Sequence, residues 1–100
     1  MRKKKIGEVM QDYQYPLDME WTTKEIILVV NLWQALEDSY EKGISAEKFL
    51  DAYKGFKTVV KSIGEERKLG REFEKLSGYS LYKAVQEAKT HPDKKLRMKG

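Results

Sequence analysis

The feature that most constrains the fold is an apolar stretch, residues 21–36, that begins with a recognisable helix start. Its residues Thr22 to Glu25 match the capping box, in which a Thr hydroxyl accepts a backbone N–H and a Glu three positions later bonds back to the cap. Apolar residues then recur at three- and four-residue steps, at Ile26, Val29, Val30, Trp33, Leu36 and Tyr40, and Ile27, Leu28 and Leu32 widen the apolar arc. We therefore predict a helix in the middle of a small bundle.

The same stretch contains a β-branched run, residues 26–30, which is also typical of a strand. The length of the periodic pattern, which continues to Tyr40, and the capping box at its start favour the helix. Gly43 then predicts a left-handed stop, because glycine adopts positive φ without steric cost. Residues 23 to about 42 are thus predicted to be helical.

Three more helices are predicted from hydroxyl caps at Ser45, Ser62 and Ser80. Their apolar stripes are, in chain order, Phe49, Leu50, Tyr53, Phe56, Val59 and Val60; then Leu69, Phe73 and Leu76; then Leu81, Val85 and Ala88. Gly55 lies inside the second predicted helix and indicates close approach of another helix. Gly70 lies inside the third and weakens the prediction that this helix is continuous. Gly78 and Pro92 predict the ends of the last two helices.

These features predict an all-α fold, a small four-helix bundle with an extended aromatic N-terminal segment packed across it. The segment has apolar side chains around Pro16, at Tyr13, Tyr15, Leu17, Met19 and Trp21. We divide the chain into a basic flexible arm, residues 1–11, a helical bundle domain, residues 12–91, and a basic C-terminal tail, residues 92–100. Within the tail, we expect residues 93–100 to be frayed.

The charge is distributed unevenly. The chain of 100 residues has 20 Lys and Arg against 16 Asp and Glu, a net charge of +4. Eight basic residues lie in the two ends, so residues 6–93 are mildly acidic. There is no cysteine, and no apolar run reaches the roughly 20 residues that span a bilayer or follows the basic start as in a signal peptide. We expect a cytoplasmic protein that does not bind membranes.

The sequence offers no constellation for catalysis, for a cofactor or for a metal ion. His91 is the single histidine, and without cysteine it cannot build a nucleophile pair or a zinc site. Ser45 and Lys48 have the Ser-x-x-Lys spacing of some acylating enzymes, but the companion motifs are missing. An enzyme would require a pocket with a carboxylate of strongly raised pKa. We expect a protein that is not an enzyme.

The leading functional hypothesis is a protein-interaction module, which binds a partner or self-associates. Tyr and Trp are typical anchors of interfaces, although they also fill the cores of small domains. The candidate partner groove is lined by Tyr13, Tyr15, Trp21, Tyr40 and Tyr79.

The alternative hypothesis is a nucleic-acid-binding accessory protein that acts through its basic ends. Flexible Lys and Arg side chains bind phosphates by releasing counterions, without sequence preference. The candidate phosphate contacts are Arg2, Lys3, Lys4, Lys5, Lys94, Lys95, Arg97 and Lys99. A steep loss of affinity with salt would distinguish this hypothesis from the first.

Four segments together resemble the uncharacterised protein family (UPF) 0223 of Gram-positive bacteria. They are Tyr13-Gln14-Tyr15-Pro16-Leu17-Asp18, Trp21-Thr22-Thr23-Lys24-Glu25-Ile26-Ile27, Ser39-Tyr40-Glu41-Lys42-Gly43-Ile44 and Glu72-Phe73-Glu74-Lys75-Leu76-Ser77-Gly78-Tyr79-Ser80, and the resemblance covers roughly residues 12–90. It implies a small cytosolic all-α protein. It supplies no activity, cofactor or catalytic residue.

Overall fold

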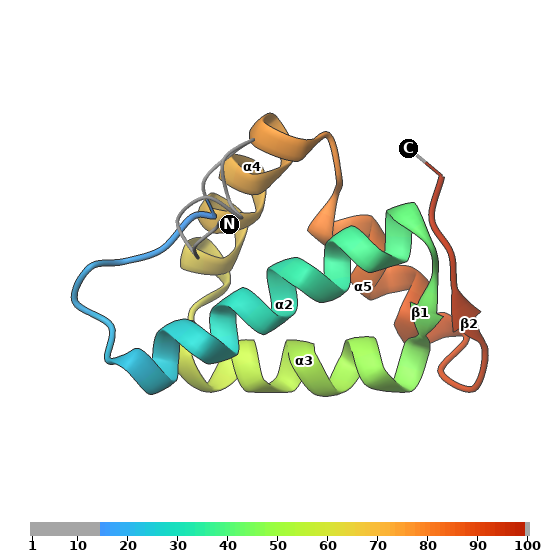
Figure 1. Ribbon diagram of the computed structural model, residues 1–100, viewed down its shortest axis with the longest axis horizontal. Helices are drawn as coiled ribbons and strands as arrows, with labels where there is room; N and C mark the ends of the chain where they lie inside the picture. The colour runs from blue at the N-terminus through green and yellow to red at the C-terminus, as the bar shows by residue number, and fades with distance from the viewer. Residues whose placement is uncertain (1–14, 100) are drawn as a thin grey trace, which may run out of the picture.

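The computed structural model describes residues 15–99, and that range contains four helices and a small antiparallel ribbon (Figure 1). The elements are α2 (Thr23–Glu41), β1 (Ile44–Ser45), α3 (Ala46–Val59), α4 (Ile63–Ser77), α5 (Leu81–Thr90) and β2 (Lys95–Leu96). The all-α prediction is confirmed, and the strand alternative for residues 26–30 is wrong. Within the described range, no helix combines the length and apolar character that crossing a membrane requires.

All four predicted caps are present. At the start of α2 the Glu25 backbone N–H donates to Thr22 Oγ1 over 3.2 Å, and the Thr22 N–H donates to Glu25 Oε1 over 2.8 Å, which completes the capping box. The hydroxyls of Ser45, Ser62 and Ser80 each accept a backbone N–H three residues later. Gly43 and Gly78 adopt positive φ, 90° and 84°, after α2 and α4, as their positions predict.

The core surrounds the middle of α2, where Trp33 is fully buried. Its ring stacks on Phe73 of α4 with centroids 4.8 Å apart and meets Phe56 of α3 edge-on at 5.6 Å. The buried apolar side chains are Val29, Leu32, Trp33, Ala35, Leu36, Ala46, Phe49, Phe56, Val60, Leu69, Phe73, Leu81, Ala84, Val85, Ala88 and Leu96. All four helices therefore contribute to one core.

The helices α2 and α3 lie side by side (Figure 1), and Gly55 allows their close approach. A Cβ at this position would meet Leu28 Cδ2 at 3.1 Å, tighter than ordinary van der Waals contact. The close approach predicted at Gly55 is confirmed. Gly70 does not interrupt α4, which is continuous from Ile63 to Ser77.

The C-terminal residues differ from the frayed tail expected from sequence. Ile44 pairs with Leu96 and Ser45 with Lys95 in the β1–β2 ribbon, and the Met98 N–H donates to the Ser39 carbonyl over 2.7 Å. Leu96 is only 2% exposed, so it belongs to the core. The expectation of fraying is therefore wrong for residues 94–98, because one apolar side chain and a set of backbone bonds hold them.

The N-terminal segment is described from Tyr15 onward, and it packs on α2 and α4. Pro16 is buried and its carbonyl accepts the Trp33 Nε1–H over 3.2 Å. Tyr15 lies 6.1 Å from Phe73, centroid to centroid. Met19, by contrast, is 94% exposed at the turn before α2. The packing thus centres on Tyr15 and Pro16, and the predicted arm, residues 1–11, lies outside the described residues.

Candidate functional site

Three of the aromatic residues predicted to line a partner groove lie together in the structure, and Trp21 lies apart from them. Tyr15, Tyr40 and Tyr79 lie beside the second half of α2, whereas half-buried Trp21 precedes its first turn. At about 1.5 Å per residue, the length of α2 separates Trp21 from Tyr40. Tyr13 lies outside the described residues. We call Tyr15, Glu37, Tyr40, Glu41 and Tyr79 the tyrosine–glutamate cluster.

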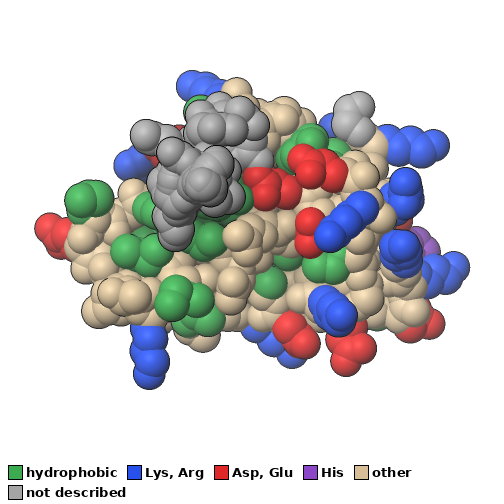
Figure 2. Space-filling model, in the orientation of Figure 1, with side chains coloured by type: hydrophobic (Ala, Val, Ile, Leu, Met, Phe, Trp, Pro, Cys, Tyr) green, Lys and Arg blue, Asp and Glu red, His purple; other side chains and the backbone are tan. Residues whose placement is uncertain are grey.

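The hydroxyls in this cluster are engaged within the fold. The Tyr15 hydroxyl donates to Glu37 Oε1 over 2.9 Å, and the Tyr79 hydroxyl donates to Glu41 Oε2 over 2.8 Å. The rings of Tyr40 and Tyr79 stack at 4.5 Å, and the Tyr40 hydroxyl accepts the Ser80 backbone N–H over 3.1 Å. Figure 2 shows acidic side chains over this half of α2. The cluster ties the N-terminal segment and the α4–α5 turn to α2.

The carboxylates of the cluster repel one another. Burial, together with the negative charges of Glu41 and Asp38, raises the pKa of Glu37 to about 7. Burial also raises the pKa of Tyr15, and the hydrogen bond to Glu41 raises the pKa of Tyr79. Glu37 therefore titrates near neutral pH, which its spacing from Glu41 alone could not establish.

A carboxylate with a raised pKa is one requirement for an acid–base enzyme, and a pocket around it is another. Glu37 lines none of the three hollows that we describe on the surface of residues 15–99. In the same range, no group of three acidic or histidine side chains is arranged to hold a metal ion. His91 follows α5 and lies 3.9 Å from Glu87.

The candidate phosphate contacts at the C-terminus lie around β2. Lys94 and Lys95 line a hollow with Lys42 and Lys48, and the Arg97 guanidinium donates to the Lys42 carbonyl over 3.0 Å. Acidic Asp38, Glu47 and Asp93 line the same hollow. Figure 2 shows several basic side chains at this edge of the molecule, at the right of the view. The hollow itself is lined by side chains of both charges. Lys99 is exposed beyond it, and Arg2, Lys3, Lys4 and Lys5 lie outside the described residues.

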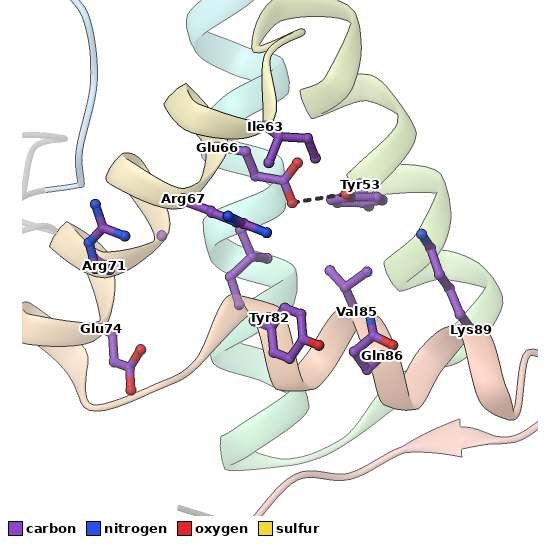
Figure 3. Close-up of a pocket in the computed structure, with 12 residues that line it drawn as sticks. Tyr53, Ile63, Glu66, Arg67, Arg71, Glu74, Tyr82, Val85, Gln86 and Lys89 are labelled. Atoms are coloured by element: carbon purple, nitrogen blue, oxygen red, sulfur yellow. Dashed lines mark hydrogen bonds between the residues drawn. The ribbon is translucent and has the colours of Figure 1, made fainter.

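A second surface, which the sequence did not single out, lies between α4 and α5 (Figure 3). This α4–α5 groove has a volume of about 370 Å³. It is lined by Tyr53, Ile63, Glu66, Arg67, Gly70, Arg71, Glu74, Leu81, Tyr82, Val85, Gln86 and Lys89. Leu81, Val85 and Gly70 are buried and belong to its apolar base, whereas Tyr82 and Ile63 are 70% and 55% exposed. Large apolar side chains thus stand beside a hollow.

Two residues that line the α4–α5 groove, Tyr53 and Glu66, belong to a hydrogen-bonded group (Figure 3). The Tyr53 hydroxyl donates to Glu66 Oε2 over 2.9 Å, and Lys57 Nζ lies 2.7 Å from Glu66 Oε1. The pKa of Tyr53 is raised to about 12, mainly by burial and secondly by the hydrogen bond to Glu66. The phenol therefore stays protonated. Lys89 Nζ lies over the Tyr53 ring, 5.6 Å from its centroid. The charge of Glu66 is compensated within the fold.

The sequence does contain an indication of the α4–α5 groove. Tyr82 flanks the buried stripe of α5 on the side away from Ala84 and Ala88, where a phenol has no core position to fill. Arg67, Gly70, Arg71 and Glu74 recur at helical three- and four-residue steps on α4. Only the packing of α4 against α5 shows that these two faces meet, which no periodicity in one helix predicts.

The chain is similar over most of its length to proteins of Gram-positive bacteria. A UPF0223 protein of Enterococcus faecalis is 57% identical over 89 residues, which cover 89% of this chain and 97% of that protein. A UPF0223 protein of Streptococcus pneumoniae serotype 19F is 50% identical over 88 residues, 88% of this chain and 96% of the relative. The family model matches residues 12–97 and so includes β2. The chain therefore belongs to the uncharacterised protein family UPF0223.

Proposed function

We propose that the protein is a cytoplasmic, non-enzymatic interaction module that binds a partner protein in the α4–α5 groove. The observation that carries this proposal is the exposure of Tyr82 and Ile63 beside a hollow with an apolar base. Tyrosine is enriched at the anchors of interfaces because its ring supplies a large contact area at low entropic cost. Leaving such side chains in water loses the free energy that a partner would recover by covering them.

The tyrosine–glutamate cluster is the less favourable partner surface, although it contains three residues of the groove predicted from sequence, Tyr15, Tyr40 and Tyr79. Its three hydroxyls already bond to Glu37, Glu41 and the Ser80 N–H, and two of its rings stack on each other. A partner would have to replace those contacts. We therefore rank the tyrosine–glutamate cluster below the α4–α5 groove as a partner surface. Trp21 belongs to neither of the two.

The proposal is tested by a photo-reactive benzophenone side chain substituted for Tyr82 in cells that naturally produce a member of this family, with the native copy removed. We expect irradiation to join the chain to one defined protein. Thr58 is the matched control, because it is exposed on α3 and lines none of the three hollows. Its benzophenone variant should give no such product.

Two outcomes would contradict the proposal. One is the absence of any protein adduct at position 82 from a variant that melts as the native protein does. The other is an equal adduct at position 58, which would indicate collisions rather than binding. An adduct found only when the photo-reactive group replaces Tyr79 would transfer the function to the tyrosine–glutamate cluster.

The second candidate function is nucleic-acid binding through the basic ends. The observation in its favour is that β2 gathers Lys94 and Lys95 beside Lys42 and Lys48. If phosphate contacts dominate, the affinity for a single-stranded oligonucleotide falls steeply with salt, with a log–log slope of about −0.7 per contact. Fluorescence anisotropy across a salt series measures this slope. A flat series, or no binding at low salt, would remove the candidate.

A further inference from the structure

We infer that the α4–α5 groove takes an acidic amphipathic segment of the partner, one with apolar side chains along one face and Asp or Glu beside them. The inference rests on the proposed function, since it names the chemistry of the partner for the same surface. Three features of the groove carry it: an apolar base, uncompensated positive charge on its walls, and a charge pattern that disfavours a second copy of the chain.

The apolar base defines what enters. Leu81 and Val85 form it from α5 and Gly70 from α4, where a Cβ would stand in ordinary van der Waals contact with Leu81 Cδ2, at 3.5 Å. The groove volume of about 370 Å³ lies in the lower part of the range for binding clefts, roughly 300–1,000 Å³. It suits a few side chains of one segment rather than a folded domain. An amphipathic helix that presents residues at three- and four-residue steps has this form.

The walls define the charge of the partner. Arg67 and Arg71 stand on successive turns of α4 (Figure 3), and among residues 15–99 neither has an ion-pair partner. Lys89 lies on the α5 side. Of the two acidic side chains in the lining, Glu66 is already paired with Lys57. The remaining acidic side chain, Glu74, offsets only part of the positive charge of the three cations. Arg also forms bidentate hydrogen bonds with carboxylates, which strengthens the preference for Asp and Glu.

A second copy of the chain fits this surface less well. Two copies joined groove to groove around a twofold axis would place the three cations of each groove, Arg67, Arg71 and Lys89, in one interface with only the Glu74 carboxylate of each copy to offset them. Like charges brought together in an interface disfavour binding. The segment Arg2 to Lys5 has the wrong charge as well. Nucleic acid would match the charge, but it would meet Glu74 and an apolar base rather than a row of stacking rings.

The test uses the full chain, labelled with ¹⁵N, and two synthetic helical peptides of about 15 residues, roughly four turns. Both peptides carry the same leucine face, and one has Glu where the other has Lys. We expect the Glu peptide to shift the amide signals of α4 and of Tyr82 to Lys89. The Lys peptide should bind at least about tenfold more weakly, because it exchanges favourable rim contacts for repulsive ones.

Two variants assign this preference to the groove. The double substitution Arg67→Glu with Arg71→Glu should weaken binding of the Glu peptide about tenfold. The control, Lys68→Glu with Lys83→Glu, makes the same change in net charge at exposed positions of the same helices that do not line the groove. It should leave the affinity within about twofold once long-range charge is screened by salt. All variants must melt as the native protein does.

The inference is overturned if the Lys peptide binds equally well, if neither peptide binds, or if the shifts fall outside α4 and α5. It is also overturned if an oligonucleotide displaces the Glu peptide from the groove and binds more tightly. In each of these cases a protein adduct at position 82 keeps the proposed function and removes only the acidic partner. A missing adduct removes the proposed function, whatever the peptides do.

Discussion

Two groups of aromatic side chains meet α2, and they differ in what surrounds them. Trp33, Phe56 and Phe73 are fully buried and contact one another. In the tyrosine–glutamate cluster the rings are half-buried and the hydroxyls bond to carboxylates and to a backbone N–H. The first group stabilises the fold by removing apolar area from water. The second joins segments through polar contacts, whose net contributions are smaller.

This difference matters for function. One partner groove was predicted at Tyr13, Tyr15, Trp21, Tyr40 and Tyr79. Of these, Tyr15, Tyr40 and Tyr79 form hydrogen bonds within the fold, and Trp21 lies apart from them. The aromatic side chain best placed to meet a partner is Tyr82, at 70% exposure. The comparison thus separates aromatic residues that stabilise the fold from Tyr82, which we propose contacts a partner, and each variant below tests a part of it.

The largest effect is expected for Trp33→Ala. The substitution removes a ring that is 0% exposed and leaves a cavity between α2, α3 and α4, so it should cost about 3–5 kcal/mol. A chemical or thermal melt measures the loss. Ile27→Ala, at a position 53% exposed on the same helix, should change stability by no more than about 0.5 kcal/mol. If the Trp33→Ala variant melted like the Ile27→Ala variant, the buried aromatic group would not be the part that stabilises the fold most.

The C-terminal strand is expected to behave like the buried group. Leu96 is 2% exposed and pairs across the β1–β2 ribbon, so Leu96→Ala should cost about 2–3 kcal/mol, at the low end for buried leucine because the site is at the edge of the core. Urea denaturation measures this cost. The neighbouring substitution Lys95→Ala, at an exposed position, is the control. Equally small losses of stability at both positions would mean that the C-terminal residues are frayed after all.

A smaller effect with a pH signature is expected for Glu37. Its pKa in the folded chain is raised to about 7, first by burial and then by Glu41 and Asp38. The folded chain therefore holds a proton that the unfolded chain has released, and the stability from this group is present at pH 4 and is lost as the pH rises through 7. Since the side chain is half-exposed, we discount the loss to about 1 kcal/mol.

Glu37→Gln tests this assignment, because Gln keeps an acceptor for the Tyr15 hydroxyl and removes the charge. The variant should be more stable than the native protein at pH 8 by about 1 kcal/mol and should lose the decline between pH 5 and 7. Denaturation midpoints across that range measure both. If the variant is less stable at pH 8, then the Tyr15 bond to a charged Glu37 outweighs burial, and the cluster is an ordinary favourable pair.

The smallest effect is expected for Tyr79→Phe. It removes an exposed hydrogen bond to Glu41 and keeps the ring that stacks on Tyr40, so the cost should be about 0.5 kcal/mol. Tyr40→Phe is a sharper companion, because it leaves the Ser80 N–H without its acceptor and should cost about 1 kcal/mol. A cost of several kcal/mol for either substitution would mean that the tyrosine–glutamate cluster contributes to stability as much as the buried core does.

Local sequence patterns predicted the elements well. The four caps depend on side chains within three residues of the backbone they bond, so they can be recognised in the sequence. The long-range features could not be predicted in this way. Leu96 looks like a single apolar residue in a basic tail, and only its pairing with Ile44 explains its burial. The raised pKa of Glu37 and the α4–α5 groove likewise depend on how helices meet. The division of the chain into a basic arm, residues 1–11, one bundle domain, residues 12–91, and a basic tail, residues 92–100, stays a prediction.

The central claim is that the partner is bound by the α4–α5 groove and not by the tyrosine–glutamate cluster. The most direct measurement is the affinity of the partner found by cross-linking for two variants, Tyr82→Ser and Tyr79→Phe. We predict that Tyr82→Ser weakens binding at least about tenfold, as expected for an interface anchor, with an unchanged melt, and that Tyr79→Phe stays within about twofold. A loss of binding for Tyr79→Phe with native affinity for Tyr82→Ser would contradict the account.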